Sequence, residues 1–416
     1  MSNLIVNAVN SLTQYFDETI EVERLVHDTG KVFRQILSPQ KSSLKSMSEI
    51  SLVNGSECRR AFFINGQFNF HHDIQTFLSA LWLKLGRHDR LIVIAYNPYL
   101  YALLPITRYF LKKSKQPIPT TFLTRASLGD LATVSGYQIV KLKPVLPLGL
   151  HAVPIIRNLA WNWLVVLRPI KEITELRKIS IIIPARNEKG NIENLIKQIP
   201  HFSIPSEIIF VEGNSTDKTW EEILRVKKKY ENTHEICCYR QKGKGKNDAV
   251  RFGFEKARGE ILTILDADIS MPPEKLSHFV NAFLKGHGDF INGDRLVYPM
   301  EDRAMQFLNR VANILFAKAL SFTLDIRLGD SLCGTKLLSK RDYLRIVQWR
   351  NNFGDFDPFG DFELLFGASV LGLGILDMPV QYKKRVYGKT NIHRFRHGIQ
   401  LLRMTIIGLF KIRGAP

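Results

Sequence analysis

Four apolar runs of strand length alternate with segments of helical length between residues 179 and 265, and this alternation constrains the fold more than any other feature. The runs lie at 179–184, 207–212, 235–239 and 260–265, with helices expected at 218–230 and 247–257. The first run is almost continuously apolar, which is typical of a strand inside a parallel sheet. The pattern therefore predicts an α/β sheet of the nucleotide-binding kind with right-handed connections.

Two aspartates, Asp266 and Asp268, follow the last of these strands, and Pro272 and Pro273 stand where the next helix begins. Ligands of open α/β sheets bind at the carboxyl ends of the strands. Carboxylates one residue apart suit Mg²⁺ or Mn²⁺ held against the phosphates of a substrate. A solvated acidic turn is the alternative for an isolated Asp-x-Asp. The neighbouring loops favour the metal site.

Composition limits the class of protein and its partners. The length of 416 residues predicts two or three domains, and 58 Lys and Arg against 39 Asp and Glu give a strongly basic chain. Such a charge attracts phosphorylated ligands, anionic membranes or nucleic acid. No zinc-finger or basic-zipper pattern occurs, so we do not expect a nucleic-acid partner. Four cysteines without metal-ligand or disulfide spacing, no run long enough to span a bilayer and no leader pattern predict a cytoplasmic protein.

The N-terminal part contains a second strand, helix, strand pattern. A strand at 61–64, a turn at Asn65-Gly66, a helix at 73–85 and a strand at 90–95 predict a βαβ unit. An earlier helix is expected at 21–36. The Trp-bearing apolar segment 155–167 is interpreted as a buried interdomain helix, with a helix in the membrane interface as the alternative.

Residues 60–168 resemble the second half of a Rossmann-like S-adenosylmethionine-dependent methyltransferase. The resemblance rests on 62–77, 91–98, 119–122, 128–131 and 135–140. The Gly-rich turn and acidic residue that seat the cofactor in that family do not precede Ala61. We therefore expect residues 1–170 to be a truncated methyltransferase-like domain, and S-adenosylmethionine is not an expected cofactor.

Polar segments at 184–188, 211–217, 243–248 and 265–268 each follow a strand or open a helix. In this order they resemble an inverting GT-A glycosyltransferase of family two, similar to dolichyl-phosphate mannose synthase, over residues 178–400. The resemblance implies a nucleotide sugar as donor and Mg²⁺ or Mn²⁺ held by Asp266 and Asp268. It implies donor contacts by Pro184, Arg186, Glu188, Glu212, Lys244, Lys246, Asn247, Asp266, Lys389 and Thr390.

The chain departs from that family at several positions. Arg186 replaces an aromatic or polar residue, and Gly213 replaces an aspartate that usually contacts the base, so the base is not predicted. Ser270 stands where a third metal ligand, a glutamine, is found in the dolichyl-phosphate synthases.

Acceptor and catalytic residues are also implied by the resemblance. Acceptor contacts are expected from Arg295, Arg303, Arg310 and Asp330, and catalytic roles from Asp268, Asp361, Glu363 and Arg385. The helix expected at 301–320 is either a lid over the acceptor groove or a core helix. A phosphate acceptor would need no strong base, because its oxygen is already anionic.

Residues 378–416 contain nine Lys or Arg and no Asp or Glu, and 398–416 is basic and amphipathic. This end is expected either to lie on the anionic inner face of the cell membrane or to pack on the sheet. The leading hypothesis is a metal-dependent inverting hexosyltransferase that transfers a sugar to polyprenyl phosphate or a cell-envelope glycan. The alternatives are a bifunctional or methyltransferase-type enzyme, and a basic protein that binds nucleic acid or a membrane surface without catalysis.

Overall fold

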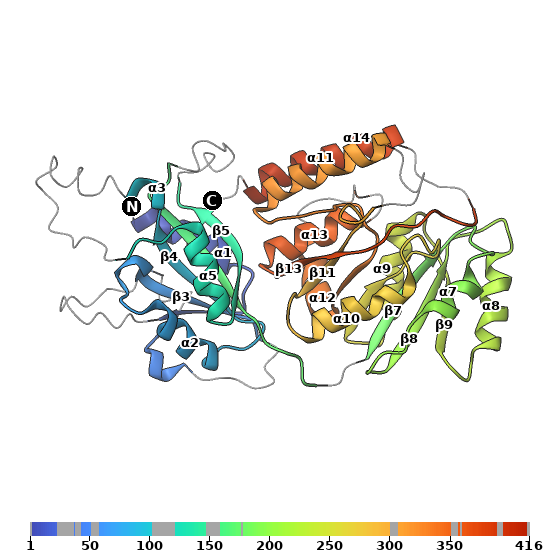
Figure 1. Ribbon diagram of the computed structural model, residues 1–416, viewed down its shortest axis with the longest axis horizontal. Helices are drawn as coiled ribbons and strands as arrows, with labels where there is room; N and C mark the ends of the chain where they lie inside the picture. Colours follow the sequence, from blue (N-terminus) through green and yellow to red (C-terminus); the bar gives the residue numbers. More distant parts are fainter. Residues whose placement is uncertain are drawn as a thin grey trace, which may run out of the picture. The chain divides into compact units, whose positions relative to one another are not determined.

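A computed structural model describes residues 2–22, 37, 43–50, 58–101, 121–146, 159–175, 178–299, 307–350, 357, 360–388 and 394–413. The chain forms two compact units, one of residues Met1–Lys171 with Leu409–Pro416 and one of residues Glu172–Gly408 (Figure 1).

The first unit is built on a six-stranded sheet in the order β2-β1-β3-β4-β6-β5. Strands β1 to β4 are parallel, whereas β6 runs antiparallel to both of its neighbours. Helices α2 and α5 cover one apolar core, and α1 packs against the core on the other face. The bounds are α1 Ser2–Thr13, β1 Glu18–Val22, β2 Ser43–Lys45, β3 Arg60–Gln67, α2 Ile74–Lys84, β4 Arg90–Tyr96, α3 Pro98–Tyr101, α5 Arg125–Val134, β5 Tyr137–Pro144 and β6 Asn162–Pro169, with short 3₁₀ turns at Met47–Glu49 and Phe68–Phe70.

Three local expectations for this unit were wrong. Residues 162–167 of the segment predicted as a helix over 155–167 lie in β6, which pairs with β4 and β5 and has both faces covered, and 155–158 lie outside the described residues. A short apolar run is compatible with a buried helix or a buried strand, and only the pairing decides. Glu21 and Val22 lie in β1 rather than a helix, and 23–36 lie outside the described residues. Asn65-Gly66 is a register shift inside β3, not a turn.

The second unit contains a seven-stranded sheet in the order β13-β11-β12-β10-β7-β8-β9. All strands are parallel except β12, which is antiparallel to β10 and β11. The bounds are β7 Ile179–Ala185, α7 Ile192–Gln198, β8 Ser206–Glu212, α8 Thr219–Lys229, β9 Glu235–Arg240, α9 Lys246–Lys256, β10 Ile261–Ile264, a 3₁₀ turn Pro273–Lys275, α10 Leu276–Leu284, β11 Phe290–Asp294, α11 Phe307–Leu324, β12 Lys336–Ser339, α12 Lys340–Arg350, α13 Asp361–Val370, β13 Ile375–Pro379, α14 Arg394–Gly408 and a π-helical turn Leu409–Arg413 assigned to the first unit.

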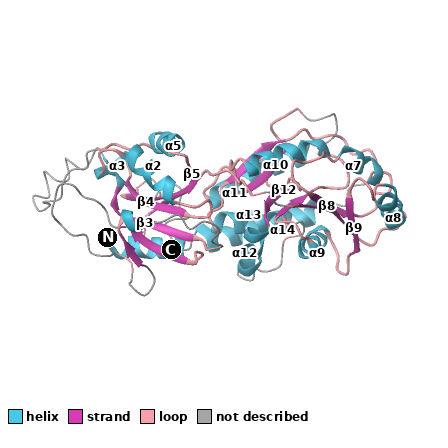
Figure 2. Cartoon of the chain, turned by 90° about the horizontal axis from the view of Figure 1, so that it is seen from below, coloured by secondary structure: helices cyan, strands magenta, loops and turns pink. Residues whose placement is uncertain are grey.

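The strands and helices predicted between 179 and 265 are confirmed, with ends that differ by one or two residues. Helices α7, α8 and α10 share one apolar core with the sheet, and α9 packs against the opposite face (Figure 2). The chain passes from β7 outward to β9 and then returns to β10 on the other side of β7. This reversal is the topological switch point of the sheet, where ligands of open α/β folds bind.

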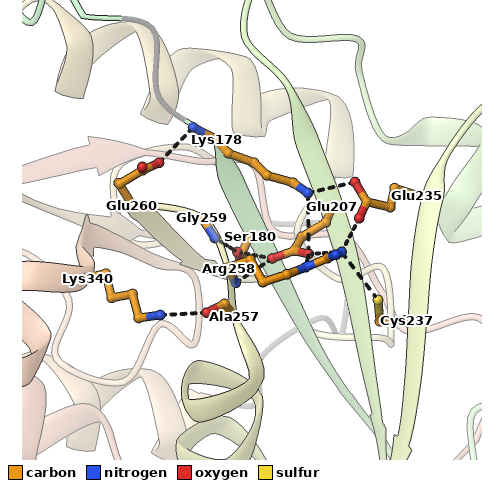
Figure 3. A network of polar contacts seen from close by, with 10 residues as sticks. All are labelled: Lys178, Ser180, Glu207, Glu235, Cys237, Ala257, Arg258, Gly259, Glu260 and Lys340. Carbon is orange, nitrogen blue, oxygen red and sulfur yellow. Dashed lines mark hydrogen bonds and ion pairs between the residues drawn. The ribbon is translucent and has the colours of Figure 1, made fainter.

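A polar network joins the amino ends of β7, β8 and β9 (Figure 3). Glu207 is completely buried and accepts hydrogen bonds from Ser180 Oγ at 2.6 Å and from the Arg258 backbone N–H at 2.7 Å. The Arg258 guanidinium contacts the other Glu207 oxygen from Nε at 2.9 Å and Nη2 at 2.7 Å, and also pairs with Glu235. This network therefore ties the three strands together at their amino ends, opposite the edge at which their carboxyl ends lie.

Candidate active site

The carboxyl ends of the parallel strands bring acids and bases together at the switch point. Arg385 comes from the segment after β13, and its Nη2 lies 2.7 Å from Asp268 Oδ2 in the loop after β10. Its Nη1 lies 2.9 Å from Glu188 Oε1 in the loop after β7. Three residues predicted from separate motifs therefore form one contact group.

Asp268 is held by the backbone that follows it. Its Oδ1 accepts hydrogen bonds from the Ser270 N–H at 3.0 Å and the Ser270 hydroxyl at 2.7 Å. Between them, Ile269 has a φ of 55°, a left-handed conformation that is strained for a β-branched residue. Burial alone would raise the pKa of Asp268, but Arg385 and the Ser270 bonds outweigh it, and the pKa lies below its ordinary value.

A second ion pair joins Lys246, the first residue of α9, to Asp266, with Nζ 2.5 Å from Oδ1. Burial opposes the charge on Lys246, but Asp266 and Asp361 raise its pKa above the ordinary value. Gly334, in the loop before β12, lies against this pair. A Cβ there would be 2.2 Å from Lys246 Nζ and 2.3 Å from Asp266 Oδ2, so a larger residue would force this ion pair to shift.

Asp361 occupies the first turn of α13 and pairs with Lys336, with Oδ1 3.0 Å from Nζ. Lys336 is fully buried at the start of β12 and also donates to the Cys333 carbonyl at 2.5 Å and to Asn292 Oδ1 at 3.2 Å. Because β12 is reversed, its first residue reaches the edge where the parallel strands end. Lys336 was not among the predicted site residues.

Glu363 also lies in the first turn of α13 and contacts two arginines. Arg350 Nε is 2.5 Å from Oε1, and Arg251 pairs with Oε2. These contacts connect α13 to α12 and α9. Asp357 Oδ2 accepts the backbone N–H groups of residues 362 and 363, at 2.8 and 2.9 Å, and thus caps the helix.

Arg295 and Asp330, both predicted to contact an acceptor, contact each other. Arg295 Nε and Nη2 lie 2.6 and 3.0 Å from the two oxygens of Asp330 in a two-pronged pair. Asn313 of α11 donates to the same carboxylate at 2.8 Å. Burial would raise the pKa of Asp330, but Arg295 lowers it to about 2.

The loops after β7 and β8 are joined through Asp217, which the predicted site set did not include. Asp217 accepts hydrogen bonds from the Lys189 N–H at 3.2 Å, the Thr219 N–H at 3.1 Å and the Tyr387 hydroxyl at 3.2 Å. The turn-forming run 214–217 was the sequence signal that could have identified Asp217.

Burial raises the pKa of Glu188 to about 7, although Arg385 acts in the opposite direction.

The remaining predicted residues occupy several positions. Pro184 lies in β7, Glu212 accepts the Ser215 N–H at 2.5 Å, and Asn247 donates to the Asp357 carbonyl at 2.9 Å. Exposed positions are held by Arg186, Lys244 on the loop before α9 and Arg310 on α11. Arg303, Lys389 and Thr390 lie outside the described residues.

The donor set at Asp266 and Asp268 fits a hard divalent cation, because it consists of carboxylate oxygens with the Ser270 hydroxyl beside them. Each carboxylate is already paired with a cationic side chain, Lys246 or Arg385. Among the described residues, no three His, Cys, Asp or Glu side chains cluster as a closed metal site.

Residues 180–346 match the family model Glycosyl transferase family 2. This part of the chain is therefore similar to family-two glycosyl transferases. Curated relatives include a dolichol-phosphate mannosyltransferase of Pyrococcus furiosus, 35% identical over 29% of this chain and 34% of that protein. A dolichyl-phosphate hexose transferase of Haloferax volcanii is 25% identical over 53% of this chain and 89% of that protein.

Other relatives match this chain over part of their own length. An undecaprenyl-phosphate 4-deoxy-4-formamido-L-arabinose transferase of Photorhabdus laumondii is 25% identical over 35% of this chain and 45% of that protein. The chain thus spans about a third to a half of the length of several relatives. A solved mannosyltransferase of Pyrobaculum calidifontis, in complex with GDP-Man and Mn²⁺, is 20% identical, with a TM-score of 0.39 over 57% of this chain and 66% of that one.

No described helix combines the length and the apolar character that crossing a bilayer requires.

Proposed function

We propose that the glycosyltransferase domain has a GT-A fold and transfers a hexose, with inversion, from a nucleotide-diphosphate donor to a polyprenyl phosphate or cell-envelope glycan. The observation that carries this proposal is the alternation of acids and cations at the switch point. Asp266 and Asp268 can hold a cation, while Lys246 and Arg385 can hold an anion. A metal ion and a diphosphate need both kinds of group side by side.

Asp266 and Asp268 would hold Mg²⁺ or Mn²⁺, which when bound neutralises charge on a diphosphate. Lys246 would contact the same phosphates from the N-terminus of α9, where backbone N–H groups favour anions. In a single displacement, an acceptor oxygen bonds to the anomeric carbon. The bond from that carbon to the diphosphate oxygen breaks, and its electron pair leaves with the nucleoside diphosphate.

Of the two carboxylates predicted near the acceptor, we assign Asp361 to it and a structural role to Glu363. Asp361 pairs with Lys336, which also donates to the carbonyl of Cys333, the neighbour of the Gly334 that lies against the Lys246–Asp266 pair. Both oxygens of Glu363 are paired with arginines. If the acceptor were a hydroxyl, Asp361 would take its proton, whereas a phosphate would need no base.

The names of the relatives support a polyprenyl phosphate as acceptor, since several are dolichyl- or undecaprenyl-phosphate sugar transferases. We propose peripheral contact with the inner face of an anionic membrane through α11 and α14, which pack together. Leu315, Ile399 and Leu402 are 63%, 69% and 53% exposed on them. Neither helix contains Asp or Glu. Anionic vesicles should float the protein at low salt, and failure to do so would reject this contact.

For the first unit we propose a truncated methyltransferase-like domain without a cofactor-binding site. The parallel strands β1 to β4, followed by an antiparallel β6 between β4 and β5, support a Rossmann-like origin. Titration calorimetry should detect no S-adenosylmethionine binding. Micromolar binding would reject the proposal.

A thermal-shift screen of UDP, GDP and their sugars with and without Mn²⁺ tests the donor assignment. One nucleotide should stabilise the protein only when Mn²⁺ is present. Asp268→Asn should abolish this shift and lower sugar transfer at least about a hundredfold, as loss of a transition-state charge contact does. Near-normal transfer by Asp268→Asn, or the absence of any nucleotide shift, would refute the proposed function.

A further inference from the structure

Arg385 contacts a carboxylate that the proposed function assigns to the metal. The Arg385 guanidinium donates a hydrogen bond to Asp268 Oδ2, and Ser270 donates two to Oδ1, so both oxygens already have partners. The Asp268 side chain is only 13% exposed. A cation that binds Asp268 must therefore replace Arg385 or share the carboxylate with it.

The guanidinium is brought to this position by residues 380–388, which we call the strap. The strap leaves the edge strand β13 and is bonded to the loop after β10 by Lys383, whose N–H donates to the Ser270 carbonyl at 2.8 Å. Beyond Arg385 the strap is held by the exposed Tyr387, through its hydroxyl bond to Asp217. The strap is anchored at Val380, which is buried in the core and whose N–H donates to the Asp294 carbonyl at 2.9 Å. Beyond it, residues 381–388 are half-buried or exposed, and such a segment opens at lower cost than a strand of the sheet. The strap can therefore release Arg385 while the sheet stays folded.

We propose that the Arg385 guanidinium binds Asp268 in the absence of ligand and competes with the divalent metal for this carboxylate. When a nucleoside diphosphate binds, the guanidinium leaves Asp268 and contacts the phosphates. This inference rests on the proposed function, because it takes Asp268 as a metal ligand. Metal alone must break the Arg385 bond and then remain near a positive charge, which lowers its affinity. A diphosphate offers the guanidinium a two-pronged anionic partner, so metal and nucleotide bind cooperatively.

Mn²⁺ binding, measured by electron paramagnetic resonance of free Mn²⁺, tests this competition without any activity assay. In the absence of nucleotide, Arg385→Gln should bind Mn²⁺ at least about tenfold tighter than the wild type, a step within the usual range of coupling between ligands. Lys383→Gln is the matched control, because it removes the same charge from the same strap and leaves the Arg385–Asp268 bond. Its affinity should stay within about twofold of the wild type, as expected for a screened surface charge.

The same titrations with UDP and GDP measure cooperativity. Nucleotide should raise the Mn²⁺ affinity of the wild type by about 10-fold to 100-fold, and by a smaller factor in Arg385→Gln. If Arg385→Gln does not fold, Arg385→Lys, whose ammonium cannot bridge two acids in the same way, should shift the affinity in the same direction.

Two results would overturn the inference, and they differ in what else they reject. If Asp268→Asn abolishes Mn²⁺ binding but Arg385→Gln binds Mn²⁺ no tighter than the wild type, the competition is wrong and the metal site stands. If no variant binds Mn²⁺ through Asp268, with or without nucleotide, the proposed function fails as well.

Discussion

Replacing Glu207 by Gln should lower the free energy of unfolding by about 3 kcal/mol. The Glu207 side chain is fully buried, and each of its oxygens accepts two hydrogen bonds, from Ser180 and the Arg258 backbone on one side and from the guanidinium on the other. Glutamine keeps the volume but can accept on one side only. Losing two bonds to a charged group costs about 1.5–3 kcal/mol each, and the half-exposed Arg258, which keeps its pair with Glu235, recovers part of this.

Glu235→Gln is the matched control, because it removes the other carboxylate from the same arginine. Glu235 is 45% exposed, so its loss should cost less than about 1 kcal/mol. Urea unfolding, followed by the fluorescence of Trp220 and Trp349 in a background in which Trp82, Trp161 and Trp163 of the first unit are replaced by Phe, reports on the second unit. Equal costs for the two variants would refute the reasoning that burial, rather than charge count, determines the contribution.

The pH dependence of the Glu207→Gln effect follows from the same contacts. Burial would raise the pKa of Glu207, but Ser180 and Arg258 outweigh it and the pKa is lowered. A depressed folded-state pKa contributes stability that is fully present above the unfolded pKa and is lost as the pH falls through the folded one. The difference between wild type and variant should be constant from about pH 6 to 8 and shrink below about pH 4. Nucleotide binding should not change, because this network lies at the amino ends of the strands.

Three further predictions concern the site itself. Gly334→Ala should lower nucleotide affinity at least about tenfold in calorimetry, because its Cβ would overlap Lys246 Nζ, and unchanged affinity would show that the pair is not used. Lys336→Met should destabilise the domain by about 3–5 kcal/mol in urea unfolding, since Asp361 loses a buried partner, and Lys336→Met with Asp361→Asn should recover most of this. Burial raises the pKa of Glu188 from 4.5 to about 7. The stability of the wild type relative to Glu188→Gln should therefore fall by up to about 3 kcal/mol as the pH rises from 4.5 to 7, and then level off. A rise in relative stability over that pH window would contradict the prediction.

Much of the second unit could be predicted from local sequence. The strands β7 to β10 are short apolar runs that end in polar or turn-forming residues, and such periodicity reflects which faces are buried. Parallel strands bring their carboxyl ends to one edge, so Asp266, Asp268 and Glu188 were correctly expected at the same place.

Side-chain partners were not predictable, because they come from distant parts of the chain. Arg385 is 197 residues from Glu188, and their contact exists only because the strap leaves β13 and reaches the switch point. Arg295 was predicted as an acceptor contact from its motif, yet in the fold it is paired with Asp330, 35 residues away.

The sequence by itself determined the strands, the helices between them and the positions of the acidic loops, since these depend on residues close along the chain. The tertiary structure alone decided that 162–169 is a strand, that β12 runs backwards and carries Lys336 to the site, and that Asp266, Asp268 and Asp361 are each paired with a cation. Local patterns record burial and turns. The partner of a strand or a charge depends on which distant residues the folded chain brings within a few ångströms, and periodicity carries no information about that.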